Sequence, residues 1–123
     1  MSNVDIVSYL NSLPDNTNFI DVSNKGITYL PDLTRFKNLE KFSCSHNKLT
    51  SLPTLPQNLQ ILYCDCNNLT SLPTLPQNLK TLDCKRNQLI SLQTLPQDLE
   101  ELNCSKYLSK IRHYTNAVAR AVF

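Results

Sequence analysis

Short segments in which apolar and polar residues alternate recur at a fixed interval along the chain. In Leu62-Tyr63-Cys64-Asp65, for example, the apolar Leu62 and Cys64 alternate with Tyr63 and Asp65. Because the side chains of a strand point alternately to its two faces, this pattern predicts short strands with one buried face. Three apolar columns repeat with a step of 20 residues: Leu39, Leu59, Leu79 and Leu99; Phe42, Leu62, Leu82 and Leu102; Cys44, Cys64, Cys84 and Cys104.

The repeated unit reads L-x-x-L-x-C-x-x-N-x-L-T-S-L-P-x-L-P-x-x, and a looser unit occupies residues 17–38. A single unit cannot bury its own apolar face, so neighbouring units must stack. Stacking places the strands side by side and parallel, about 4.8 Å apart. The Leu-Pro-x-Leu-Pro segment that returns to the next strand favours an extended path, because proline fixes φ and has no N–H.

An asparagine follows the strand at the same place in three units, at Asn47, Asn67 and Asn87, whereas Lys25 stands there in the first unit. The amide group has two donors and an acceptor, so it can satisfy backbone groups inside a buried turn. We therefore expect these residues to form a structural turn ladder in which each asparagine links its unit to the next.

The motif L-x-x-L-x-C-x-x-N-x-L, repeated over residues 17–104, resembles the leucine-rich repeat family. The halves at 50–59 and 70–79, T-S-L-P-T-L-P-Q-N-L, are similar to the short subclass seen in secreted effectors of pathogenic bacteria. The cysteine in the strand is similar to that of repeat proteins encoded by giant DNA viruses of amoebae. The resemblance implies an α/β solenoid: a short right-handed arc with a parallel β-sheet on its concave face, which binds proteins.

Helical patterns flank the repeats on both sides. Residues 3–13 place Ile6, Val7, Leu10 and Leu13 at helical spacing, with Ser2 or Asn3 able to cap the start. The stripe in the tail consists of Tyr107, Ile111, Tyr114, Val118 and Ala121. Because the terminal units of a solenoid expose core, we expect helical caps at both ends. The predicted single domain, 1–123, thus has an N-terminal cap at 1–16, about five repeats at 17–104 and a C-terminal cap at 105–123.

Charge excludes some classes of partner. The 123 residues hold 12 Lys and Arg against 10 Asp and Glu, a balance that gives no support to nucleic-acid binding. No stretch reaches the roughly 18 apolar residues that a transmembrane helix needs. The basic tail helix has a second interpretation, in which it contacts a membrane surface. Asp5 interrupts the apolar start, which argues against a secretion signal. We expect the protein to be a monomer. We expect it to be intracellular, in the cytoplasm, which could be that of a host cell.

The cysteine spacing argues against disulfides and zinc. The four cysteines of the column are spread over three strand gaps, too far apart for one tetrahedral ion, so we interpret them as small buried hydrophobes and expect neither metal nor cofactor. Cys66 lies instead in an outer column with His46 and Arg86. Both neighbours could lower its pKa and make it a reactive thiol; the alternative is a chance surface cysteine, since no third orienting group is evident.

The outward strand positions predict a binding surface on the concave sheet. Ile61 and Tyr63 form its expected anchor, and its charged rim consists of Lys41, Asp65, Asp83 and Lys85. We interpret the chain as a non-catalytic protein–protein interaction module with an unidentified protein partner, not as an enzyme. The alternatives are the repeat portion of a ubiquitin-ligase-type effector that lacks its catalytic domain, and a self-assembling structural protein.

Overall fold

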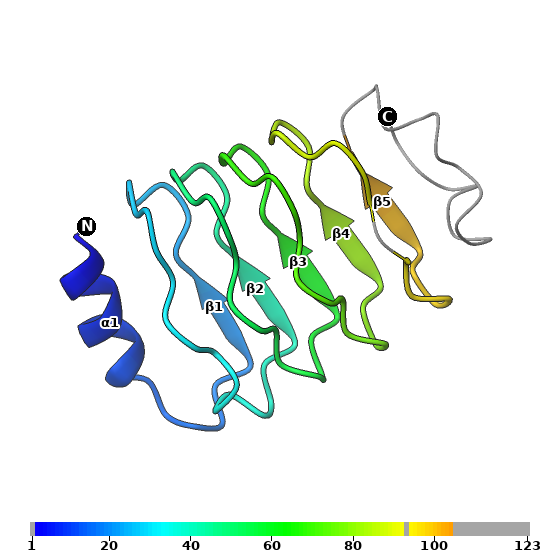
Figure 1. Ribbon diagram of the computed structural model, residues 1–123. Helices are drawn as coiled ribbons and strands as arrows, with labels where there is room; N and C mark the ends of the chain where they lie inside the picture. Colours follow the sequence, from blue (N-terminus) through cyan, green and yellow to red (C-terminus); the bar gives the residue numbers. More distant parts are fainter. Residues whose placement is uncertain (1, 93, 105–123) are drawn as a thin grey trace.

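The computed structural model describes residues 2–92 and 94–104. Within these residues one helix, α1 (Asn3–Asn11), precedes five strands: β1 (Phe19–Asp21), β2 (Lys41–Ser43), β3 (Ile61–Tyr63), β4 (Thr81–Asp83) and β5 (Glu101–Asn103). The strands form a parallel sheet in the order of the sequence, so the chain advances by one strand with each turn of a solenoid (Figure 1). The predicted parallel sheet and solenoid are therefore confirmed.

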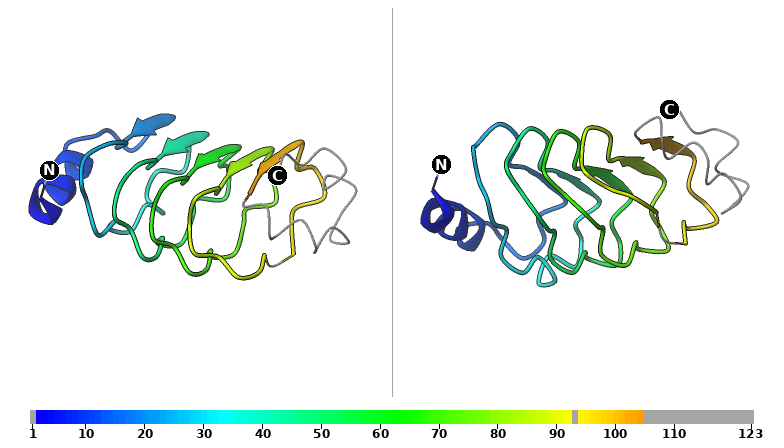
Figure 2. Two further views of the ribbon diagram at one scale, coloured as in Figure 1. Left: turned by 90° about the horizontal axis from the view of Figure 1, so that it is seen from above. Right: turned by 45° about the horizontal axis from the view of Figure 1, so that its top comes forward.

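The register of the sheet follows the repeat length. Leu62 of β3 pairs with Phe42 of β2 and Leu82 of β4, each 20 residues away. Phe19 of β1 pairs with Lys41 at an offset of 22, so the two extra residues of the first unit are accommodated outside the sheet. The strands lie along one side of the solenoid and the returning segments along the other (Figure 2). Identical positions of successive units consequently become neighbours across the sheet.

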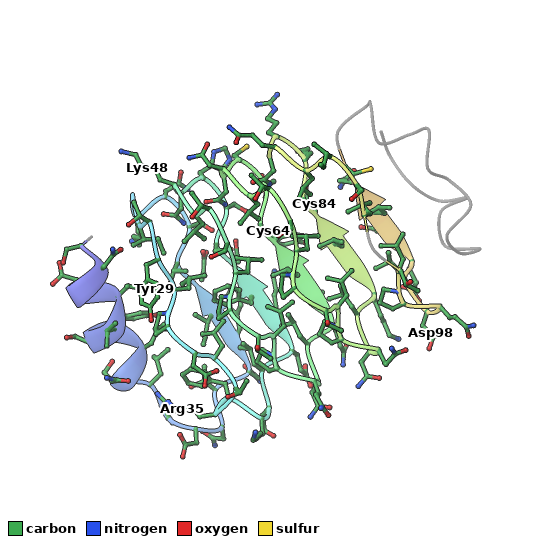
Figure 3. The ribbon with its side chains drawn as sticks, in the orientation of Figure 1. Tyr29, Arg35, Lys48, Cys64, Cys84 and Asp98 are labelled. Carbon is green, nitrogen blue, oxygen red and sulfur yellow. The ribbon has the colours of Figure 1, made fainter. Side chains whose placement is uncertain are left out.

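The core is built from the inward columns. The middle residues of the strands are at most 2% exposed; they are Ile20, Phe42, Leu62, Leu82 and Leu102. The cysteine column continues this buried surface: Cys44, Cys64 and Cys84 are fully buried, and all five cysteines are free. Figure 3 labels Cys64 and Cys84, which follow β3 and β4 in adjacent units. Burial raises the pKa of Cys64 well above its ordinary value, which keeps this thiol protonated. The interpretation of the column as small buried hydrophobes is confirmed.

Helix α1 lies at the N-terminal end of the sheet (Figure 1). Ser2 caps it through a reciprocal capping box with Asp5, in which Ser2 Oγ accepts from the Asp5 N–H at 3.1 Å. Ile6 and Leu10 are buried in the core. Among the described residues, no helix is long and apolar enough to cross a membrane. The C-terminal helix expected at 105–123 lies outside the described residues, so helical caps at both ends are not established.

Arg35 joins the end of α1 to the solenoid (Figure 3). Its guanidinium donates to the carbonyls of Leu10 at 2.6 Å and Leu13 at 3.1 Å, pairs with Asp15, and lies 4.0 Å from the centre of the Phe36 ring. Carbonyls at a helix C-terminus lack partners within the helix, so a cation there is stabilising. No repeated position or spacing in the sequence indicates this contact.

Replacing Arg35 with alanine is expected to lower the free energy of unfolding by about 1 to 2 kcal/mol, because these charge-assisted bonds are lost from a partly exposed site. Urea denaturation measures the loss. The exposed neighbour Lys37 provides the matched control, and its alanine variant should change stability by less than about 0.5 kcal/mol. Equal effects of the two substitutions would remove the role given to Arg35.

Candidate functional site

The solvent-facing side of the sheet, here called the sheet face, carries the predicted binding residues. This face consists of the residues on either side of each buried strand centre, because side chains alternate along a strand, and of the residue two positions after each strand ends. All six predicted partner-binding residues lie on it: Lys41, Ile61, Tyr63, Asp65, Asp83 and Lys85. The face divides into an aromatic part over β1 to β3 and an acidic part at the ends of β3 and β4.

In the aromatic part, Lys41 lies between two rings. Its Nζ atom is 5.0 Å from the centre of the Phe19 ring and 5.5 Å from the centre of the Tyr63 ring. Each such cation–π contact contributes about 0.5 to 1 kcal/mol at an exposed site and restricts the rotamers of the lysine. Ile61 pairs with Lys41 across the sheet and adds an apolar side chain. Phe19, half exposed, is a member of this cluster that the sequence analysis did not assign to the site.

In the acidic part, two weakly exposed carboxylates lie close together. Ser45 Oγ donates to Asp65 Oδ1 at 2.5 Å, and Lys85 Nζ lies 3.6 Å from Asp83 Oδ2. Burial, followed by the negative charge of Asp65, raises the pKa of Asp83 above its ordinary value. This part of the sheet face therefore favours a cationic ligand group.

The turn asparagines bind the backbone of two units at once. Asn67 Oδ1 accepts from the Leu49 N–H at 3.0 Å, and its Nδ2 donates to the carbonyls of Cys44 at 3.0 Å and Cys64 at 3.2 Å. Asn47 and Asn87 repeat this arrangement in their own units. The unit that each asparagine reaches is the preceding one, not the next one as expected from the sequence. The chain turns directly after each strand, which brings the amide beside the strand end of the preceding unit, as at Cys44 for Asn67.

The column of Cys66 has a special backbone. Asn24, His46, Cys66 and Arg86 all have φ between 54° and 58°, in the left-handed region where only glycine and asparagine are common. Burial and then Asp65 raise the pKa of the Cys66 thiol, and the opposing effect of Arg86 does not outweigh them. Arg86 therefore acts in the expected direction, but the expected net lowering of this pKa is wrong, because burial has the larger effect and Asp65 adds to it.

Cys66 is nevertheless expected to react with a water-soluble maleimide far faster than Cys44, Cys64 and Cys84 in the native protein. Its side chain is partly exposed, whereas the other three are fully buried. Mass spectrometry of peptides after short exposure to the reagent measures the four rates. Denatured protein, in which every thiol is accessible, gives the reference rates. Similar native rates for all four would contradict the observed orientation of the two columns.

The structure also places one possible ligand atom from each of His46, Asp65 and Cys66 within 4.8 Å of one another. The argument from spacing against a metal concerned the inward cysteine column, and in the outer column His46 was considered only for its effect on the pKa of Cys66. The signal was present in the alignment of units, where His46 and Cys66 share a column and Asp65 directly precedes Cys66.

Comparisons with known proteins agree with this architecture. Residues 37–77 match a family model described as leucine-rich repeats in two copies. YopM from Yersinia enterocolitica WA-314 is 40% identical, with a TM-score of 0.70, over 76% of this chain and 20% of YopM. A Shigella effector leucine-rich repeat domain is 36% identical, with a TM-score of 0.68, over 76% of this chain and 40% of that domain. The chain thus spans less than half the length of both structures.

A search of curated protein sequences returned no match. The repeat motif, the parallel solenoid and the two structural neighbours nevertheless agree with one another. Residues 37–77 are therefore leucine-rich repeats, and the solenoid is similar to the leucine-rich repeat domains of these bacterial proteins.

Proposed function

We propose that this chain is a non-catalytic interaction module that binds a protein partner on a concave sheet face. The observation that carries this proposal is Lys41, held between the rings of Phe19 and Tyr63 on adjacent strands. An apolar and aromatic centre with a charged rim is the common layout of protein interfaces. The restricted rotamers lower the entropic cost of binding, since fewer side-chain conformations are lost in the complex.

The two parts of the sheet face define the chemistry of the partner. An apolar or aromatic side chain of the partner packs on Ile61 and Tyr63. A lysine or arginine of the partner approaches Asp65 and Asp83, whose carboxylates have only one lysine, Lys85, within 4.0 Å among the described residues. This arrangement favours a partner segment that presents both kinds of side chain a short distance apart.

We place this binding in the cytoplasm, the cytoplasm of a host cell included. Five free cysteines with no disulfide among the described residues fit a reducing compartment. The similarity to a leucine-rich repeat domain of a Shigella effector supports the same class of role. In this proposal α1 covers the N-terminal end of the core through Ile6 and Leu10.

Replacing Tyr63 with alanine is expected to weaken binding to the captured partner by about 10-fold to 100-fold, the usual effect of removing an aromatic anchor. The partner is first captured from cell extract with the wild-type chain, and calorimetry then measures the affinity of each variant. Tyr29 is the matched control, because it is an exposed tyrosine on a returning segment away from the sheet. Loss of affinity in Tyr29→Ala with none in Tyr63→Ala would reject the sheet face as the binding surface.

A further inference from the structure

Three side chains with different donor atoms meet at the edge of the sheet where β2 and β3 end. His46 follows β2, and Asp65 and Cys66 follow β3. His46 Nε2 lies 3.9 Å from Asp65 Oδ2, and one donor atom from each of the three residues falls within a 4.8 Å limit. Neighbouring units of the solenoid thus supply an imidazole nitrogen, a carboxylate oxygen and a thiol sulfur to one place.

A hydrogen bond from Ser45 orients the Asp65 carboxylate, so that its second oxygen is available to a metal ion. Ser45 Oγ donates to Asp65 Oδ1, which leaves Oδ2 directed toward His46. Hydrogen bonds of this kind fix the ligands of metal centres and are a regular part of their outer shell. The side chain of Asp65 is only 13% exposed, whereas that of His46 is 54% exposed and has room to move.

We propose that His46, Asp65 and Cys66 form a binding site for Zn²⁺ or a similar borderline transition-metal ion. The combination of nitrogen and thiolate donors selects such ions over Mg²⁺ and Ca²⁺, which take oxygen ligands. On binding, the S–H bond of Cys66 breaks, its proton passes to solvent and a sulfur–metal bond forms. The thiolate and the carboxylate then neutralise the two charges of the ion, and water completes the coordination.

The spacing of the His46 and Asp65 donors is close to the one that the ion requires, and Cys66 offers its sulfur within 4.8 Å of both. Donor atoms around tetrahedral zinc lie about 3.5 Å apart, given bond lengths near 2.0 to 2.3 Å. The His46 and Asp65 donors, at 3.9 Å, have to approach by a few tenths of an ångström, which rotation of the exposed imidazole supplies. Such an ion would join two adjacent units on the outside of the solenoid, independently of the core.

Arg86 opposes the ion. It occupies the same column as Cys66 in the next unit, and its positive charge and hydrogen bond have a lowering effect on the pKa of the Cys66 thiol. A cation at this position repels a metal ion bound to Cys66. Removing this charge should therefore leave the affinity for the metal unchanged or increase it, whereas removal of any ligand should decrease it.

Titration of the full chain with Co²⁺, in a reductant that contains no thiol, tests the site. The wild type should bind one ion and develop the near-ultraviolet charge-transfer band of a thiolate–cobalt bond, and Zn²⁺ should displace the ion. Cys66→Asn should abolish the band, and His46→Asn and Asp65→Asn should each weaken binding at least about tenfold. Asparagine suits both column positions, because Asn24 holds the same backbone conformation with φ 58°.

Arg86→Gln is the control in the same column, and circular dichroism confirms the fold of every variant. A thiolate band that persists in Cys66→Asn would overturn the proposal, since the ion would then bind another cysteine. Absence of the band in the wild type, or tenfold weaker binding in Arg86→Gln, would overturn it too. None of these results depends on the protein partner, so this site and the proposed binding function fail or hold separately.

Discussion

Replacing Asn67 with alanine is expected to lower the free energy of unfolding by about 3 kcal/mol, because several buried backbone groups lose their partners together. The side chain of Asn67 serves the Leu49 N–H and the carbonyls of Cys44, Cys64 and Asp65, all within 3.2 Å. An unsatisfied buried group costs about 1 to 3 kcal/mol, and water entering the new space relieves part of the sum. Urea denaturation at constant temperature measures the difference.

Asn68 is the matched control for this substitution. It is the adjacent residue and the same amino acid, but it is exposed. Asn68→Ala should change the free energy of unfolding by less than about 0.5 kcal/mol. Asn67→Asp tests the chemistry in addition, since it retains the size of the side chain but turns an oxygen toward three carbonyl oxygens. Its destabilisation should equal or exceed that of Asn67→Ala; a loss as small as that of Asn68→Ala would show that the asparagine does not hold the units together.

The sequence was sufficient for the inward columns because each unit repeats the same physical constraint. Phe42, Leu62 and Leu82 occur at one position of the unit, and stacking makes them neighbours in the sheet. Burial of such a column needs only the alternation of the strand and a fixed step, both of which are visible in the sequence. Alternation alone would put Cys66, two residues after Cys64, on the same face; Cys66 is partly exposed because β3 has ended at Tyr63 and the chain turns there, with a φ of 57° at Cys66.

Contacts between columns could not be predicted in this way. Lys41 lies between Phe19 of its own column and Tyr63 of the next, so the contact is diagonal and depends on side-chain rotamers. Arg35 contacts the end of a helix 25 residues away, where no repeat constrains the distance. The pKa of Cys66 was misjudged for a related reason, because it reflects a balance among burial, Asp65 and Arg86 and not a single neighbour.

Leu62 and Tyr63 provide the strongest test of the two faces, since they are adjacent on β3 and point in opposite directions. Leu62 is fully buried between Phe42 and Leu82 of the neighbouring strands, and Leu62→Ala should cost about 2 to 5 kcal/mol through lost burial and a residual cavity. Tyr63 is half-buried on the sheet face, so Tyr63→Ala should cost about 1 kcal/mol, chiefly the packing and the contact with Lys41. Thermal and urea denaturation both measure the difference.

The loss of stability expected for Leu62→Ala is so large that a milder substitution is also needed. Domains of this size are stable by only about 5 to 15 kcal/mol, so Leu62→Ala removes a large share of the total. Leu62→Val removes one methylene and should lower the free energy of unfolding by about 1 kcal/mol, which keeps the chain folded and the comparison measurable. A greater loss in Tyr63→Ala than in Leu62→Ala would mean that β3 presents its faces the other way round. The sheet face would then consist of the residues now placed in the core, and a partner would meet leucine and cysteine instead of Lys41 and Asp83.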